Sequence, residues 1–126
     1  IDPVGMRYLL NYTYRKYGLP IMITENGLGA VDEFIDGRIN DDYRIDYLKQ
    51  HLREMKKAIL EDHIECIGYL MWGPIDLVSA TNGEMKKRYG FIYVNKYDDG
   101  SGDLSRIPKD SFYWYQNIIQ IQGEEL

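Results

Sequence analysis

Two amphipathic segments in the first half of the chain predict helices. Pro3–Tyr17 starts with a proline, follows Asp2 as a capping residue and stops at Gly18, an arrangement typical of a complete helix. A second helix is expected to begin near Asp41 or Asp42, because apolar side chains then recur three and four positions apart. This apolar stripe consists of Ile45, Leu48, Leu52, Met55 and Ile59.

Two short apolar runs flank the second helix and predict parallel strands. Ile21–Thr24 and Glu65–Trp72 do not alternate with polar residues, a pattern typical of strands buried on both faces. Strand, crossover helix and strand together form a βαβ unit. Further along, Tyr89–Val94 is predicted to be one arm of a hairpin, with a turn at Asp98–Asp103.

A last helix is expected to begin near Asp110 or Ser111, with Phe112, Tyr115 and Ile119 on one stripe. Only two of the predicted strands resemble core strands of a parallel sheet, and two such strands leave hydrophobic edges bare. The predicted fold class is therefore α/β. We expect the chain to be the C-terminal piece of a larger α/β barrel, with the last two βα units present and a hairpin after the final strand.

Composition narrows the class of protein. The 126 residues have the length of one domain at most, and 44% hydrophobic with 28% charged residues indicates a globular protein with a core. A net charge of −5, with no basic cluster longer than Lys86–Arg88, argues against nucleic-acid binding. No apolar run reaches the roughly 18 residues of a membrane span. The single cysteine, Cys66, cannot form an internal disulfide, which favours a reducing, cytoplasmic setting.

The first candidate for catalysis is Glu25. Functional side chains of parallel α/β folds gather where strands end, and Glu25 follows the first predicted strand directly. A carboxylate there is costly unless it is hydrogen-bonded or active, so the alternative is a salt-bridged or loop-capping glutamate. His51 and His63 lie apart from further ligands, so we expect no metal site.

Three motifs resemble glycoside hydrolase family 1, the β-glucosidase type of (β/α)8 TIM barrel. Ile23–Gly27 reads Ile-Thr-Glu-Asn-Gly and is similar to the motif that carries the family's nucleophile at the end of the seventh strand. Gly68–Trp72, Asp76 and Lys87–Val94 resemble the eighth strand and the loop after it. The resemblance spans essentially the whole chain and implies that it is the C-terminal quarter of the barrel, with Glu25 as the nucleophile.

The resemblance also implies a retaining mechanism. A retaining glycosidase needs two carboxyls about 5 Å apart, one to attack the anomeric carbon and one to protonate the leaving oxygen. The family's acid/base glutamate lies in an Asn-Glu-Pro motif, which does not occur in this sequence. We therefore expect no activity from this chain alone. We also expect no cofactor. Trp72 resembles the tryptophan whose indole lines the sugar site, with core packing as the alternative.

Position 79 indicates the substrate class. In family members that act on plain glucosides, a glutamate stands seven residues after the strand's tryptophan and a second tryptophan follows; here Ser79 and Ala80 occupy these places. A glutamate repels a phosphate, whereas a serine hydroxyl can donate to it. The chain thus resembles the 6-phospho-β-glucosidase branch, whose phosphate pocket of serine, lysine and tyrosine matches Ser79, Lys87 and Tyr89.

Alternatives stay open at this point. Lys86 or Arg88 can share the role of Lys87, and Ser79 or Tyr89, taken singly, also fits a turn or a core position. Within the family the alternatives are a plain β-glucosidase and a 6-phospho-β-galactosidase, the latter disfavoured by the missing second tryptophan. From another class, a small non-catalytic α/β module would bind a phosphosugar or oligomerise, with its strand edges satisfied by self-association. The preferred partner is a small phosphorylated β-glucoside.

Overall fold

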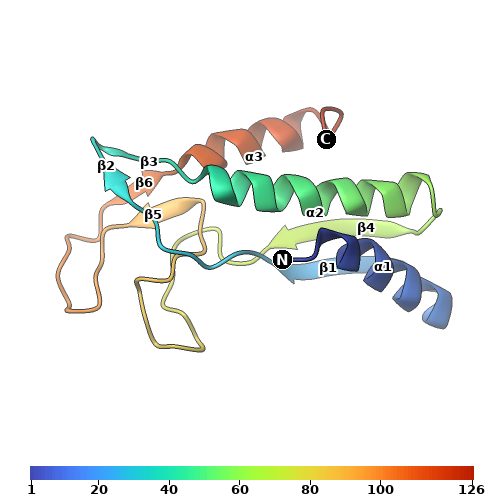
Figure 1. Cartoon of the computed structure of the whole chain (residues 1–126), viewed down its shortest axis with the longest axis horizontal. Coiled ribbons are helices and arrows are strands. Elements are labelled where there is room, and N and C mark those ends of the chain that lie inside the picture. Colours follow the sequence, from blue (N-terminus) through green and yellow to red (C-terminus); the bar gives the residue numbers. More distant parts are fainter.

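Two parallel strands and the helix that connects them form the centre of the structure (Figure 1). A computed structural model describes residues 1–126. Strand β1, Ile21–Asn26, pairs with β4, Cys66–Met71, and helix α2, Asp42–Leu60, crosses between them. The predicted βαβ unit is therefore confirmed. Both strands point toward the same end of the molecule, where the long loops gather (Figure 1).

Helix α1, Pro3–Tyr17, has the predicted bounds and caps. The carboxylate of Asp2 accepts a hydrogen bond from the Gly5 amide at 3.1 Å, which satisfies one of the free donors at the helix start. Gly18 ends the helix in the left-handed conformation, with φ 64°, and its amide donates to the Tyr14 carbonyl. Local sequence thus sets both ends of α1.

The hydrophobic core lies between α1, α2 and one face of the strand pair. It consists of Met6, Leu10, Ala58 and Ile64, against which Ile21, Ile23 and Tyr69 of the strands pack. Burying each large apolar side chain contributes about 1.5–3 kcal/mol. Helix α2 buries Leu48 and Leu52 of the predicted stripe, and it also buries Arg44 and His51.

The other face of the strand pair is bare. Met22, Ile67 and Leu70 point away from the core and are 45%, 66% and 49% exposed. The expectation that both strands are buried on two faces is therefore wrong for this chain, because its three helices lie on one side and no second layer covers the other. The sheet has only these two strands, so each keeps a free edge.

Two small antiparallel pairs stand at the loop end. Strand β5, Ile92–Val94, pairs with β6, Arg106–Pro108, which confirms the predicted hairpin, although its first arm begins at Ile92 and not at Tyr89. Strands β2, Phe34–Ile35, and β3, Arg38–Ile39, form a second hairpin in a stretch that had no predicted strand. Its turn is Asp36-Gly37, both at positive φ, the sequence and conformation of a tight hairpin turn.

Helix α3, Asp110–Gln120, begins where predicted, and Phe112 and Tyr115 of the predicted stripe are half-buried, but Ile119 is not part of the buried face. Ile119 is 62% exposed, whereas Ile118 is 8% exposed and faces the protein. The cause is the anchor at the start of α3: the amide and hydroxyl of Ser111 both donate to Asp41, at 2.8 and 2.5 Å, and this fixes the rotation of the helix. None of the three helices combines the length and apolar character needed to cross a membrane.

Candidate active site

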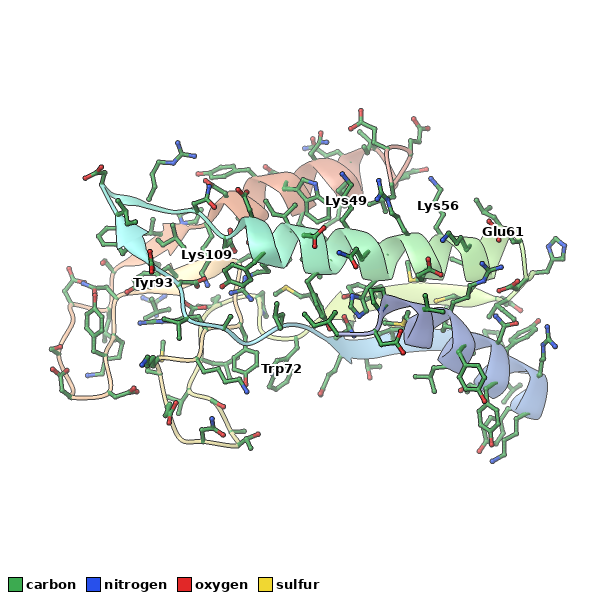
Figure 2. All side chains as sticks on the ribbon, viewed as in Figure 1. Lys49, Lys56, Glu61, Trp72, Tyr93 and Lys109 are labelled. Atoms are coloured by element: carbon green, nitrogen blue, oxygen red, sulfur yellow. The ribbon has the colours of Figure 1, made fainter.

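Glu25 and Trp72 stand at the adjacent ends of the two parallel strands. The Trp72 amide donates to the Asn26 carbonyl at 2.9 Å, and Asn26 pairs with Met71 in the strand register. Gly27 lies so close to Trp72 that a β-carbon there would approach the Trp72 backbone oxygen to 3.2 Å. The two candidates therefore share the loop end of the strand pair, on which Figure 2 also places Trp72.

Glu25 is exposed in this chain and lines an open groove of about 270 Å³ between β1 and α1. The neighbouring Asn26 is held instead: its side-chain oxygen accepts the Tyr69 hydroxyl at 2.8 Å. Burial raises the pKa of Tyr69, so this phenol keeps its proton and remains a donor. The strand end is thus fixed next to a carboxylate that is open to a ligand or to further protein.

Ser79, Lys87 and Tyr89, the residues that the family resemblance groups together, lie close to one another in the structure. Ser79 is fully buried, and its hydroxyl lies 3.2 Å from the Tyr89 hydroxyl. The ammonium group of Lys87 lies 5.6 Å from the centre of the Tyr89 ring. The hydrogen bond with Ser79, and then the contact with Lys87, lower the pKa of Tyr89 below its usual value. A hydroxyl, a cation and a phenol therefore meet at one place, which we call the Ser79–Lys87–Tyr89 cluster.

Arg88 does not join this cluster. Its guanidinium is 3% exposed and turned away, donating to the carbonyl oxygens of Val94 at 2.6 Å and Lys96 at 2.7 Å. The alternative in which Arg88 shares the role of Lys87 finds no support in this geometry, since the Arg88 donors hold the β5 strand and the turn after it. Lys86 is exposed, and of the three neighbouring cations only Lys87 places its charge over the Tyr89 ring.

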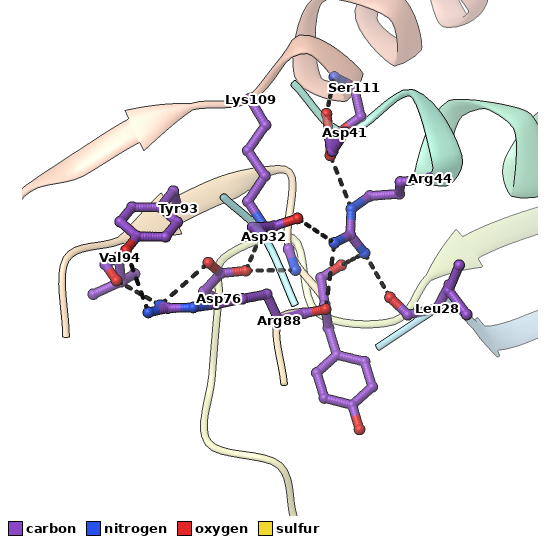
Figure 3. A network of polar contacts seen from close by, with 12 residues as sticks. Leu28, Asp32, Asp41, Arg44, Asp76, Arg88, Tyr93, Val94, Lys109 and Ser111 are labelled. Atoms are coloured by element: carbon purple, nitrogen blue, oxygen red, sulfur yellow. Dashed lines mark hydrogen bonds and ion pairs between the residues drawn. The ribbon is translucent and has the colours of Figure 1, made fainter. Parts of the chain in front are cut away.

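A network of buried ions contacts the backbone of the segment that carries Tyr89 (Figure 3). Arg44 is fully buried and pairs with Asp41 at 2.9 Å. Its guanidinium also donates to the carbonyl oxygens of Leu28 at 2.5 Å and Tyr89 at 3.0 Å. These two carbonyls belong to the loops that follow Glu25 and Lys87, so Arg44 joins the loop after β1 to the segment that carries Lys87 and Tyr89.

The second half of the network centres on Lys109. Its ammonium group bonds Asp32 at 2.5 Å and Asp76 at 2.7 Å, and all three side chains are fully buried. Asp76 also accepts the Gly90 amide at 2.9 Å, so it fixes the backbone of the segment after Tyr89. The desolvation cost of burying these charges is offset because each carboxylate contacts a cation and accepts a hydrogen bond from a further donor.

Sequence inspection missed most of this network. Arg44 lies one helical turn before Leu48, on the apolar stripe of α2, and a charge on that stripe was an available signal. Lys109 offered no such signal, because its two partners come from distant parts of the chain. No group of three or more His, Cys, Asp or Glu side chains is arranged to hold a metal ion.

Comparisons with known proteins agree on one family. The chain is 54% identical to the aryl-phospho-beta-D-glucosidase BglA of Bacillus subtilis and 56% identical to a 6-phospho-beta-glucosidase of Dickeya chrysanthemi; it is matched over its full length and covers 26% and 27% of these proteins. Beta-glucosidase 28 of Arabidopsis thaliana is 38% identical over 98% of the chain, which covers 21% of it. The chain thus spans about a quarter of the length of the curated relatives it matches.

Solved structures give the same result. A family 1 β-glucosidase from Thermotoga maritima superposes with a TM-score of 0.87 at 36% identity, over 98% of this chain and 27% of that protein. The sequence profile described as glycosyl hydrolase family 1 matches residues 1–124. With nearly every residue matched in sequence and in backbone, the chain belongs to glycosyl hydrolase family 1.

Proposed function

We propose that this chain is part of a retaining β-glycosidase that hydrolyses 6-phospho-β-glucosides to glucose 6-phosphate and an aglycone. The observation that carries the proposal is the Ser79–Lys87–Tyr89 cluster, whose donors and single cation fit a phosphate dianion. The names of the bacterial relatives support the same substrate class. We place the reaction in the cytoplasm because the single Cys66 favours a reducing setting, and a dianionic substrate is retained there since it does not cross a bilayer unaided.

In this proposal Glu25 is the nucleophile and Trp72 packs against the sugar ring. Their place at adjacent strand ends supports these roles, since catalytic residues of α/β barrels stand at the C-terminal ends of strands. The bare face and open edges of β1 and β4 fit the last two βα units of an eight-stranded barrel. A retaining site needs a second carboxyl about 5 Å away, so we expect the 126 residues alone to be inactive.

The test of the substrate class compares 4-nitrophenyl 6-phospho-β-glucoside with 4-nitrophenyl β-glucoside, using the complete enzyme that contains this chain. We expect wild type to prefer the phosphorylated substrate. Ser79→Glu should lower kcat/KM for that substrate by about tenfold to a hundredfold, because a carboxylate would replace a donor to a charged group. Ser105→Glu, at an exposed serine, is the control. An unchanged preference in Ser79→Glu would refute the phosphate assignment.

The role of Glu25 is tested separately. Glu25→Ala should lower kcat by about three orders of magnitude or more, the usual loss when a nucleophile is removed. Added azide should restore turnover and give the α-glycosyl azide, because azide then attacks the anomeric carbon directly. Glu84→Ala, at an exposed loop glutamate, should keep full activity. If the Glu25→Ala variant stays active without azide, another residue is the nucleophile.

A further inference from the structure

The loop after β1 lies directly against the segment that carries Lys87 and Tyr89. Ala30 and Arg88 exchange two backbone hydrogen bonds, at 2.9 and 2.6 Å. Two residues earlier in the loop, the Leu28 carbonyl shares the Arg44 guanidinium with the Tyr89 carbonyl. Gly29 lies between these two hydrogen-bonded positions, so its backbone is held close to the Ser79–Lys87–Tyr89 cluster.

Gly29 has no room for a side chain. A β-carbon there would lie 2.5 Å from Cε1 of Tyr89, 2.6 Å from its Cζ and 2.8 Å from Cε of Lys87. Gly29 is not among the glycines at positive φ, so the position demands space and not an unusual backbone conformation. The atoms that this β-carbon would meet belong to the outer parts of the Tyr89 and Lys87 side chains. These side chains can rotate aside while the hydrogen-bonded backbone stays in place.

We propose that Gly29 determines the preference for a phosphorylated substrate, because the missing side chain lets Tyr89 and Lys87 close against the loop. This inference rests on the proposed function. A methyl group at position 29 turns the phenol and the ammonium group out of place and separates Tyr89 from Ser79, while the strand end that carries Glu25 is unaffected. Gly29 is therefore a positioning residue that acts through two groups that bind phosphate.

Gly90 offers a matched contrast in the neighbouring segment. A β-carbon there would meet backbone atoms: the amide nitrogen of Asp76, and the carbonyl carbon of Ile75 at 2.5 Å. Backbone held by a sheet bridge between Ile75 and Ile92 cannot rotate aside. The same chemical change, glycine to alanine, should therefore disturb the fold at position 90 and only the phosphate contacts at position 29.

The experiment measures kcat, KM and Tm of the complete enzyme with phosphorylated and plain 4-nitrophenyl β-glucosides. For Gly29→Ala we expect KM for the phosphorylated substrate to rise about tenfold to a hundredfold, as for loss of hydrogen bonds to a charged group. The kcat with the plain substrate and the Tm should stay at wild-type values, whereas Gly90→Ala should lower the Tm. In a Tyr89→Ala background, Gly29→Ala should have a smaller effect, since only Lys87 remains in the way.

Four outcomes overturn the inference. If Gly29→Ala raises KM equally for both substrates, the glycine has a structural role only. The same holds if Gly29→Ala lowers the Tm as Gly90→Ala does. If wild type prefers the phosphorylated substrate and Gly29→Ala keeps that preference, the inference fails and the proposed function stands. If wild type shows no such preference, the proposed function fails and the inference fails with it.

Discussion

At the scale of single residues, the proposed recognition of phosphate depends on three side chains from one loop region. Ser79, Lys87 and Tyr89 are separated by at most ten positions, yet the loop between them must fold back to bring the two hydroxyl groups within 3.2 Å. Ser79 accepts the Gly83 amide through its carbonyl and donates its own amide to Glu84, which closes this turn. The cluster is thus built by backbone hydrogen bonds around it.

The lowered pKa of Tyr89 predicts a pH effect. A neutral phenol can donate to phosphate, whereas a phenolate repels it, so kcat/KM for the phosphorylated substrate should fall as pH rises through the pKa of Tyr89. Because that pKa is lowered, the fall should begin below the ordinary phenol value of about 10. Ser79→Ala removes the main cause of the shift and should move the fall to higher pH.

The control is Tyr89→Phe, in which this alkaline fall should disappear while the plain substrate keeps its wild-type pH profile. The measurement is kcat/KM for both substrates between neutral and alkaline pH. A fall at the same pH in wild type and in Ser79→Ala would show that another group causes it.

At the scale of elements, buried charges join the helices to the loops. Asp41 ends the loop before α2 and binds both Arg44 of that helix and Ser111 of α3. Asp41 stands at the N-cap position of α2, but its side chain makes no cap hydrogen bond there and links the two helices instead. Exposed pairs such as Arg38 with Asp110 contribute much less, because water screens them.

The difference in stability between buried and exposed ion pairs can be measured. Arg44→Met should lower the free energy of unfolding by about 3–5 kcal/mol, since Asp41 and two carbonyls would lose their partner inside the protein. Arg38→Met, the same change at a 76% exposed side chain, should change it by less than about 1 kcal/mol. Urea unfolding of the complete enzyme checks both variants. Equal effects of the two substitutions would show that the buried network contributes little to stability.

At the scale of the whole molecule, the chain leaves much apolar surface without a partner. Beyond the bare strand face, α1 exposes Val4, Tyr8, Leu9 and Tyr12, at 54% to 70%. Exposed patches of this kind mark contact surfaces with other protein. In the proposed barrel they pack against the remaining strands and helices.

The isolated 126-residue chain should therefore self-associate. Light scattering during size-exclusion chromatography should show oligomers or aggregates at micromolar concentration, because open edges of β1 and β4 and the bare face can pair between copies. A stable monomer with a cooperative melting transition would instead favour a self-sufficient small module.

Local patterns in the sequence were enough for the three helices and the two parallel strands, but not for the β2–β3 hairpin. The caps of α1, the apolar stripe of α2 and the two unalternated strands are short-range signals, and each led to the observed element. Glu25 and Trp72 followed from the rule that parallel strands end at one edge, together with the family motifs. The Ser79–Lys87–Tyr89 cluster needed the family resemblance, because loop geometry cannot be derived from spacing.

Tertiary structure alone decided which charges are buried and which are free. Lys109 meets Asp32 across 77 positions and Arg88 turns to the backbone of β5, and no local pattern specifies such partners. The same holds for Ile118, which is buried in place of Ile119 because Ser111 fixes the rotation of α3 from a distance. Propensity and periodicity act over one or two turns of chain, whereas a buried charge is stable only where folding brings its partners together.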